Sequence, residues 1–377
     1  MNTITPVQIK RNNCKIIYDL LYQSGKASKQ EIASRLHLSL PTVTQNLVHL
    51  EELGLIEKAG HFSSQVGRRA AAYDICPSAR VAIGVEILKT SVRILAVDLK
   101  GRILSQEALP FFYENTDAYC RLVSQEIQNF ARGLPVSSSQ ILGVGFALQA
   151  LVSPDGQRIV YGKILECTDL SVSAFLQHLP FPCRFLHDAD CAAISELWAD
   201  PHLKNGMYLS IGKHLGAALI WDGEILAGKH GHSATIEHMQ MDAKGSLCYC
   251  GQRGCLETWC SLTALLKENE SLEDFFTALR KDSPRFQKRW QQFLDHLATA
   301  INNLHLVFDG DYILGGHIAP YLLPRDVEML HQMIREKAAF PEEADFIQIS
   351  RMPVHNVPIG AALPFVREFL GSVLAAV

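Results

Sequence analysis

The first 60 residues carry three stripes of apolar residues at helical spacing, separated by capping and turn residues. The first stripe lies within residues 6–25, and its members are Ile9, Ile16, Ile17, Leu20 and Leu21. A second helix is predicted to start at Ser28, which forms a capping pair with Glu31. A third is predicted to run from Ser39 to Gly54. The short turn between the last two predicts a helix-turn-helix.

Helix-turn-helix geometry places the first turn of the third helix in the major groove of DNA. The residues predicted to meet base edges there are Pro41, Thr42, Thr44, Gln45 and Asn46. Two strand-like segments, 55–58 and 72–75, predict a two-stranded wing. Arg68 and Arg69 near its tip are candidates for a minor groove or for phosphates. An ordinary interaction domain of three helices and a hairpin is the alternative.

From Val81 onward, apolar runs rich in β-branched residues alternate with helical segments. The runs predicted as strands are 81–88, 92–99, 141–148, 183–186, 207–211, 216–221 and 312–314. The clearest helix starts at Ser283-Pro284. Its apolar face consists of Phe286, Trp290, Phe293, Leu297, Ile301 and Leu304. Alternation of this kind predicts an α/β domain.

Charge separates the two parts of the chain. The 377 residues carry a net charge of -4, but residues 1–72 alone have a net charge of +4 and the remainder -8. Only the N-terminal part is therefore biased toward a polyanion such as DNA. No apolar run approaches the roughly 20 residues that span a bilayer, and the N-terminus lacks the pattern of a signal peptide. We expect a cytoplasmic protein without a membrane partner.

Three cysteines within eight residues predict a metal site. Cys248, Cys250 and Cys255 converge if the chain turns sharply at the glycines between them, and His238 is the nearest fourth ligand for a tetrahedral zinc. Cys260 and His232 are the substitutes for the fourth position. One structural zinc ion (Zn2+) per chain is expected, with a chance cluster of three thiols as the alternative. The other cysteines are dispersed, which favours reduced thiols.

The segment from His238 to the Cys-x-Cys-Gly-x-x-Gly-Cys-Leu-Glu run at 248–257 resembles the ROK family of bacterial repressors and sugar kinases. The likeness extends over nearly the whole chain and is to the repressor branch, which includes the xylose and N-acetylglucosamine repressors. It implies a winged helix-turn-helix over 1–75 and, over 76–377, a two-lobed actin-like (ribonuclease H-like) domain with a sugar between the lobes. It also implies a homodimer or homotetramer.

The resemblance also locates the phosphate-binding turns of the family's kinases. The first corresponds to residues 86–90 and has lost both glycines, and the second, at 212–216, has lost its middle glycine and its threonine. Only Gly315-Gly316 remains of the set. Because backbone amides reach phosphate where glycines allow close approach, ATP-dependent phosphoryl transfer is not expected, and neither are catalytic residues.

The effector site that the resemblance implies falls on His187, Asp188, Thr235, His238 and Glu257. Asp188, His238 and Glu257 match residues of the family's sugar site. Thr235 replaces a glutamate, His187 an asparagine, and the bulky Glu237 a glycine, so an ordinary hexose is expected to bind poorly. Taken alone, Asp188 is a helix cap and Glu257 a first-turn carboxylate.

These patterns favour a zinc-containing, sugar-responsive repressor of carbohydrate metabolism that binds a double-stranded DNA operator and catalyses nothing. One alternative is a sugar kinase with a fused DNA-binding head. The other is a regulator with a vestigial sugar cleft, controlled by a protein partner. A single short recognition helix offers few contacts, so binding to an inverted repeat as a homo-oligomer is expected.

Overall fold

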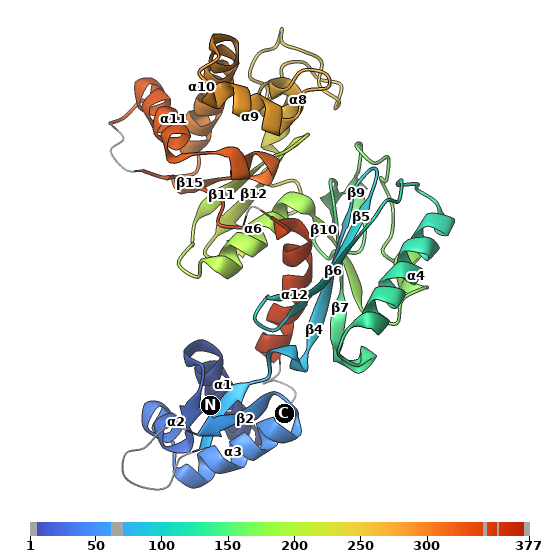
Figure 1. Ribbon diagram of the computed structural model, residues 1–377, viewed down its shortest axis with the longest axis vertical. Coiled ribbons are helices and arrows are strands. Elements are labelled where there is room, and N and C mark those ends of the chain that lie inside the picture. The colour runs from blue at the N-terminus through green and yellow to red at the C-terminus, as the bar shows by residue number, and fades with distance from the viewer. Residues whose placement is uncertain (1–5, 62–70, 342–344, 353, 373–377) are drawn as a thin grey trace.

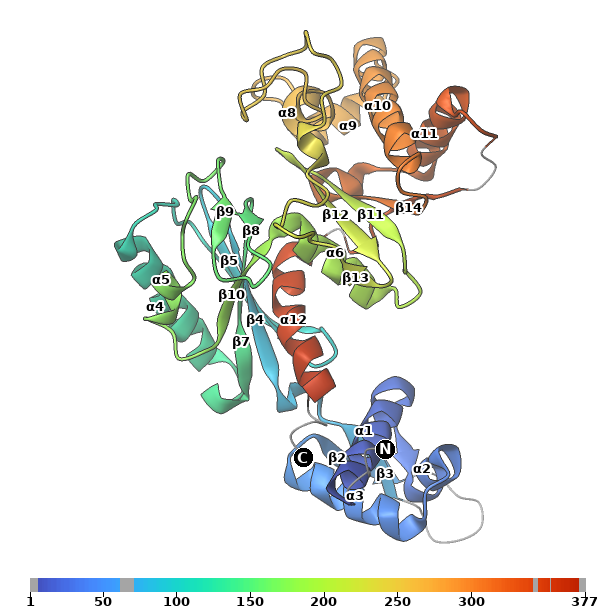
Figure 2. The same cartoon turned by 180° about the vertical axis from the view of Figure 1, so that it is seen from behind.

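The computed structural model describes residues 6–61, 71–341, 345–352 and 354–372 of the chain. Figure 1 shows three parts along the long axis: a small N-terminal module at one end and two larger lobes beyond it. The C-terminal helix runs from between the lobes back toward the N-terminal module (Figures 1 and 2).

The N-terminal module consists of α1 (Pro6–Ser24), β1 (Ala27–Ser28), α2 (Lys29–Leu36), α3 (Leu40–Glu52), β2 (Ile56–His61) and β3 (Ala71–Ile75). The predicted capping box is present, because Ser28 Oγ accepts from the Glu31 amide and Glu31 Oε2 accepts from the Ser28 amide. Ser39 caps α3, and Gly54 follows it with φ of +67°. β1, β3 and β2 form an antiparallel sheet. The predicted winged helix-turn-helix is confirmed; Arg68 and Arg69 lie outside the described residues.

The first lobe contains β4 (Val81–Ile87), β5 (Val92–Asp98), β6 (Ile103–Leu109), α4 (Asp117–Gly133), β7 (Ile141–Leu148), β8 (Leu151–Val152), β9 (Ile159–Tyr161), α5 (Ser173–Leu176) and β10 (Cys183–His187). The five-stranded sheet has the order β10-β7-β4-β5-β6. β4, β5 and β6 pair antiparallel, and β7 and β10 join them in parallel. β8 and β9 pair separately, after the carboxyl end of β7.

The second lobe contains α6 (Asp188–Ala199), β11 (Gly206–Ile211), β12 (Leu215–Trp221), β13 (Glu224–Ile225), α7 (Glu257–Cys260), α8 (Leu262–Leu265), α9 (Leu272–Arg280), α10 (Pro284–His305), β14 (Asp311–Gly315), α11 (Pro324–Lys337) and β15 (Ile347–Ile349). Its sheet order, β13-β12-β11-β14-β15, repeats the first lobe: an antiparallel set of three followed by two parallel strands. Two such sheets in succession form the expected two-lobed, actin-like α/β architecture.

α12 (Asn356–Ser372) closes the first lobe although it is last in the sequence. It packs on β4, β5 and β7 and on α6. The contact is close enough to require glycine: a Cβ at Gly84 would lie 1.7 Å from the Pro358 carbonyl oxygen, and one at Gly360 would lie 1.7 Å from that of Cys191. α12 and α6 therefore sit together where the two lobes meet.

The winged-helix module shares a core with the first lobe. One buried cluster contains Ile17 and Leu21 of α1, Val97 and Leu99 around the end of β5, and Val366 of α12. Because these apolar side chains are excluded from water together, the module is held against the lobe by hydrophobic burial as well as by the chain connection.

A polar joint reinforces this contact at the turn that follows β5. Tyr22 Oη donates to the Leu99 carbonyl oxygen at 2.7 Å, and Lys100 Nζ lies 3.8 Å from the centre of the Tyr22 ring. Trp198 Nε1 also donates to this turn, to the Lys100 carbonyl oxygen at 3.1 Å. Trp198 belongs to the last turn of α6, so α1 and α6 meet on the same turn.

Of the helices in the described part of the chain, none combines the length and the apolarity that a bilayer crossing demands.

Candidate functional site

The outward face of α3 holds most of the predicted DNA contacts. Pro41 and Gln45 are exposed, and Thr42 and Thr44 are half-buried. The Thr42 hydroxyl lies 2.8 Å from Ser39 Oγ, so the cap partly fixes its position. Four of the five predicted residues are therefore accessible near the start of the helix.

The predicted base contact of Asn46 is contradicted by its burial in the structure. Its side chain is 2% exposed, Nδ2 donates to the Thr42 carbonyl oxygen at 2.8 Å, and Oδ1 accepts from Cys14 Sγ at 2.9 Å. Asn46 follows Val43 by three residues and precedes Leu50 by four, which places it on the buried stripe of α3. The spacing to Val43 and Leu50 can be read from the sequence, so the burial of Asn46 could have been predicted. Leu40 and Val48, 48% and 46% exposed, were missed on the outward face.

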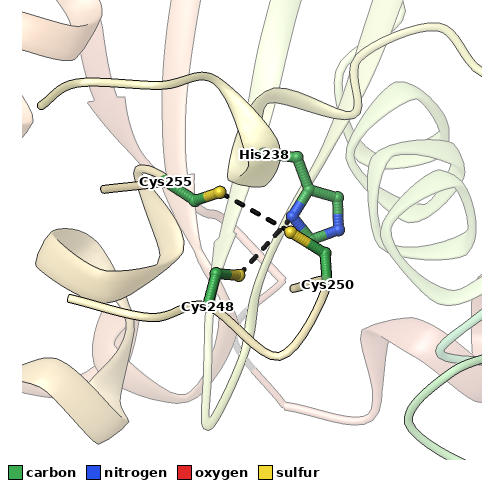
Figure 3. A group of neighbouring side chains, drawn as sticks. All are labelled: His238, Cys248, Cys250 and Cys255. Atoms are coloured by element: carbon green, nitrogen blue, oxygen red, sulfur yellow. Dashed lines mark hydrogen bonds between the residues drawn. The ribbon is translucent and has the colours of Figure 1, made fainter. Parts of the chain in front are cut away.

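The four predicted metal ligands come together in one cluster (Figure 3). The candidate ligand atoms of His238, Cys248, Cys250 and Cys255 all lie within 4.8 Å of one another. His238 Nδ1 is 3.7 Å from Cys248 Sγ, and Cys250 Sγ is 3.7 Å from Cys255 Sγ. With Zn–S and Zn–N bonds of about 2.3 and 2.0 Å, the edges of a tetrahedral site are roughly 3.5–3.8 Å. The spacing therefore fits a zinc ion.

The loop conformation explains why glycines separate these cysteines. Gly254 has φ of +68°, and a Cβ on it would lie 1.6 Å from the Asp242 carbonyl oxygen. Gly251 has φ of +96°, and its amide donates to the Cys248 carbonyl oxygen at 2.9 Å. The two substitutes for the fourth ligand are not part of the cluster: Cys260 lies in the core of the second lobe and His232 is exposed.

A cavity lies between the lobes, beside the metal cluster. The first lobe contributes Gln149, Tyr161 and Lys163, and the second contributes Glu237, His238 and Tyr249. His187 and Asp188 line it from the junction of β10 and α6. Three of the five predicted effector residues, His187, Asp188 and His238, therefore face this cavity.

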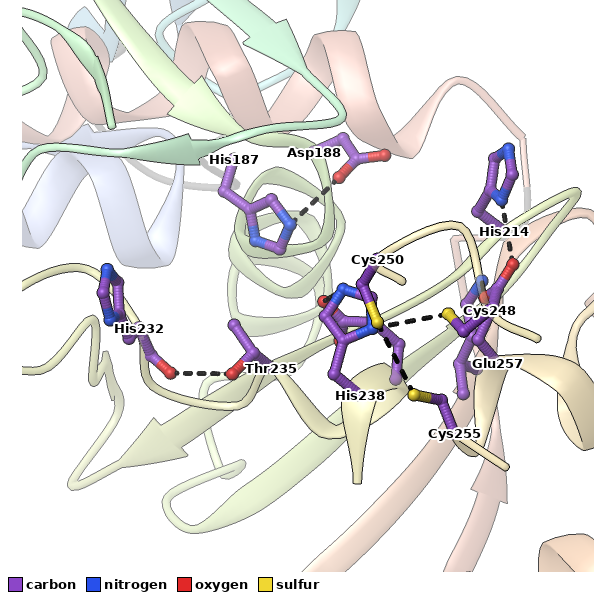
Figure 4. A network of polar contacts seen from close by, with 12 residues as sticks. His187, Asp188, His214, His232, Thr235, His238, Cys248, Cys250, Cys255 and Glu257 are labelled. Carbon is purple, nitrogen blue, oxygen red and sulfur yellow. Dashed lines mark hydrogen bonds and ion pairs between the residues drawn. The ribbon is translucent and has the colours of Figure 1, made fainter. Parts of the chain in front are cut away.

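Charged side chains lie close together at the junction of β10 and α6. His187 Nε2 lies 3.3 Å from Asp188 Oδ1, and His187 Nδ1 lies 3.8 Å from Asp190 Oδ1 (Figure 4 shows the pair with Asp188). Burial lowers the pKa of His187, but the hydrogen bond and charge of Asp190, with the charges of Asp188 and Glu237, outweigh it and raise that pKa to about 9. Burial raises the pKa of Asp188, partly offset by His187. His187 is therefore a cation held between two aspartates.

Glu237 is the second carboxylate of the cavity. The residue is 7% exposed, and its Oε2 atom has no hydrogen-bond partner among the described residues. Its Oε1 atom lies 4.0 Å from His238 Nε2. Burial raises the pKa of Glu237 to about 7. The sequence pointed to Glu237 only as a bulky departure from the family pattern, not as a cavity residue.

Two predicted effector residues do not line the cavity. Both oxygens of Glu257 bond within the second lobe: Oε1 is 2.8 Å from His214 Nδ1, and Oε2 accepts from the Leu215 amide at 2.7 Å (Figure 4 shows the His214 pair). Glu257 thus fixes the start of β12. Thr235 Oγ1 donates to the His232 carbonyl oxygen at 3.1 Å, and Thr235 is not among the lining residues. The predicted effector contacts of Glu257 and Thr235 are therefore corrected.

The turn predicted to have lost its phosphate-binding glycines connects β4 and β5. Glu86 is buried there and pairs with Arg93 at 3.0 Å, and the Leu88 amide donates to the Ser91 carbonyl oxygen at 2.9 Å. Lys89 and Thr90 carry exposed side chains at its tip. The turn is closed on itself by its own hydrogen bond.

A winged helix-turn-helix joined to a two-lobed actin-like body, with a cavity between the lobes and a cluster of one histidine and three cysteines beside it, defines the class of this protein. The chain belongs to the ROK family, whose model matches residues 82–362. A second model, described as winged helix-turn-helix DNA-binding, matches residues 15–57.

Individual relatives agree with this assignment. The chain is 28% identical over 258 residues to the DNA-binding transcriptional dual regulator NagC of Escherichia coli K12. That alignment covers 66% of this chain and 62% of the relative, so less than two thirds of the relative is matched. Among solved structures, a ROK family transcriptional regulator described as a homologue of the E. coli MLC protein has a TM-score of 0.76, with 21% identity and 98% coverage of both chains.

Kinases of the family share the fold of the body. A ROK family glucokinase from Streptomyces griseus, in complex with glucose and AMPPNP, has a TM-score of 0.65 and 19% identity. The match covers 75% of this chain and 98% of the kinase. The fold of the lobes therefore does not separate regulator from enzyme, whereas the N-terminal module does distinguish the two structures.

Proposed function

We propose that this protein is a sequence-specific transcriptional regulator of carbohydrate metabolism, acting as a repressor, whose operator binding responds to a sugar or sugar derivative. The observation that carries the proposal is the outward face of α3, where Pro41, Thr44 and Gln45 are accessible at the start of a capped recognition helix. The name of the E. coli relative, a DNA-binding transcriptional regulator, supports it. The protein would act in the cytoplasm, on double-stranded DNA.

The proposed base contacts are Pro41, Thr42, Thr44 and Gln45, with Gln45 suited to adenine. Leu40 and Val48 flank them, four residues either side of Thr44, and would contact thymine methyl groups. Arg68 and Arg69 are proposed to hold phosphates or a minor groove. Because one recognition helix covers only a few base pairs, we propose a homodimer or homotetramer that reads an inverted repeat.

The cavity between the lobes is the proposed effector site, with His187, Asp188 and His238 as its predicted contacts and Glu237 added by the structure. α6 offers a physical route from this cavity to the DNA-binding module. It begins at Asp188 and, 10 residues later, its Trp198 bonds to the turn that also contacts Tyr22 of α1. A ligand that moves α6 would therefore move a contact of the winged helix.

We propose one structural zinc ion per chain, bound by His238, Cys248, Cys250 and Cys255. The four donors and the distances between them suit a closed tetrahedral site, which leaves no position for substrate. His238 would bind through Nδ1, the nitrogen nearest to Cys248. Its Nε2–H would then face Glu237, which links the metal loop to the cavity.

We further propose that the protein is not an enzyme. The kinase relatives share only the fold of the lobes, while the turn between β4 and β5 carries Leu88 and Lys89 where the family's kinases have glycines. Backbone amides there are screened by side chains from a close approach to phosphate.

Selection of bound duplexes from a random library, followed by footprinting, tests the regulator proposal. We expect an inverted repeat with half-sites about one helical turn, or a multiple, apart. Gln45→Ala should relax base preference at one position by about 1–3 kcal/mol and leave non-specific affinity nearly intact. Arg68→Ala with Arg69→Ala should weaken all sequences and flatten the salt dependence. Gln125→Ala, exposed on α4, is the matched control.

The proposal fails if no sequence is enriched, or if a monomer protects an asymmetric site. Equal effects of the α3 and arginine substitutions across salt concentrations would contradict the separate roles of recognition helix and wing.

A further inference from the structure

Glu237 gives the cavity a carboxylate oxygen that nothing in the described protein satisfies. The side chain is 9% exposed, lines the cavity, and leaves Oε2 without a partner. A buried acceptor without a donor costs about 1–3 kcal/mol, and more when it is charged. The fold bears this cost at a lining position, where a ligand can supply the donor.

The charges around Glu237 show which donor fits. The cation beside it, His187, has both ring nitrogens directed at other carboxylates, Asp188 at 3.3 Å and Asp190 at 3.8 Å. His214 is paired with Glu257, and Arg93 with Glu86. These contacts leave Glu237 without a cation of its own.

The remaining basic groups do not change this balance. Lys163 lines the cavity but is exposed, so water and salt screen its charge. His238, as a zinc ligand, would be neutral, and a zinc ion with three thiolates carries a net charge of -1. Acidic side chains therefore outnumber the cations buried at the cavity, which disfavours phosphorylated and acidic sugars.

We infer that the effector is a polyhydroxylated molecule with a protonated amine, such as a hexosamine, whose ammonium group binds Glu237 while hydroxyl groups bind Asp188 and Gln149. This inference rests on the proposed function and names the ligand class of the same cavity. A hydrogen bond from ammonium to carboxylate is about twice as strong as one between neutral groups. A hydroxyl in the same place would give Oε2 a donor but would bring no opposite charge to the carboxyl group.

Calorimetric titration of the full-length, zinc-loaded protein tests the inference. Glucosamine, galactosamine and mannosamine are each compared with the N-acetyl derivative, the parent hexose and the 6-phosphate. At least one free hexosamine should bind about tenfold or more tightly than its three counterparts. Glu237→Gln keeps the shape of the side chain and removes its charge, so it should reduce this preference to within about threefold. Glu114→Gln, exposed on the first lobe, should preserve it.

Zinc content of each variant, measured in parallel, separates loss of the amine contact from damage to the metal loop. A wild-type preference for a neutral or phosphorylated sugar overturns the inference, and so does a preference that survives in Glu237→Gln. If hexoses bind only to the Glu237→Gly variant, the Glu237 side chain blocks the cavity sterically and does not contact the effector. In each of those cases the regulator proposal still holds if the sugar that binds changes the affinity for the operator. If no sugar binds the wild-type protein or any variant, the proposed effector site is wrong.

Discussion

His187 lies between the carboxyl groups of Asp188 and Asp190 at the edge of the cavity. Its folded pKa, about 9, is raised above the ordinary value of 6.5. A group with a raised folded pKa stabilises the fold fully below the unfolded pKa, and the stabilisation is lost as pH rises through the folded pKa. The stabilisation that His187 contributes is therefore lost between about pH 6.5 and about pH 9.

The variant His187→Gln should consequently be less stable than wild type by roughly 3 kcal/mol near pH 6, because it leaves Asp188 and Asp190 without their cation. The difference should shrink as pH rises and nearly vanish above pH 9.5. Urea unfolding at pH 6, 7.5 and 9.5 measures it, with exposed His202→Gln as a control. A difference that is constant or grows with pH would show that the histidine is not charged in the fold.

At the scale of single residues, the sequence predicted which residues belong to the metal cluster and the cavity better than it predicted which partners their side chains contact. His238 and the three cysteines form the expected cluster because the glycines between them leave few other paths for the loop. Glu257 was expected at the sugar, yet two contacts from residues some 40 positions away, His214 and Leu215, occupy it. Such long-range partners have no local signal in the chain.

Among the elements, the loop between His238 and Cys255 depends most on a ligand. Between His238 and Cys255 it has only isolated bridges and turn hydrogen bonds and no helix or strand, so zinc would add the cross-links that hold the loop together. Cys250→Ser should reduce zinc from one ion per chain to near zero and lower the thermal midpoint by at least about 5 °C. It should also expose residues 239–256 to protease.

Elemental analysis of protein purified without added metal, together with limited proteolysis, provides the readout. Cys76→Ser, a partly buried cysteine outside the cluster, should keep its zinc. Well under one zinc per wild-type chain, or a fully loaded Cys250→Ser protein, would refute the metal assignment.

The elements of the body that were predicted are those with a strong apolar pattern. α10 has seven buried residues at helical spacing, and β4 is buried throughout, so both were expected from their apolar pattern. β6, at the edge of its sheet, mixes exposed and half-buried residues and was missed. β8, β9, β13 and β15 have two or three residues each and exist because a neighbouring strand pairs with them. Such pairing depends on which strand the tertiary fold brings alongside, and the local sequence of the short segment does not show it.

For the molecule as a whole, the choice between regulator and kinase is open to direct assay. With ATP, magnesium and the same sugar panel, the protein should release ADP at the background rate, because side chains crowd the turn between β4 and β5. A sugar kinase of the family serves as the positive control. Sugar-dependent release of ADP that disappears in Asp188→Asn would restore the enzyme assignment.

In the whole molecule, α6 connects the cavity to the DNA-binding module. α6 runs from the cavity to the joint with α1, and Gly101, with φ of +75°, lets Trp198 pack on the turn, since a Cβ there would lie 2.5 Å from Trp198 Nε1. Trp198→Phe keeps the ring packed and removes the donor to Lys100. It should preserve sugar affinity and operator recognition while weakening their coupling.

The equilibrium dissociation constant for the selected operator, with and without a saturating concentration of the sugar that binds most tightly, tests the central claim most directly. In wild-type protein the constant should change by about tenfold, in the range of ordinary allosteric coupling, and in Trp198→Phe by distinctly less. An operator affinity that the bound sugar leaves unchanged in wild-type protein would contradict the account.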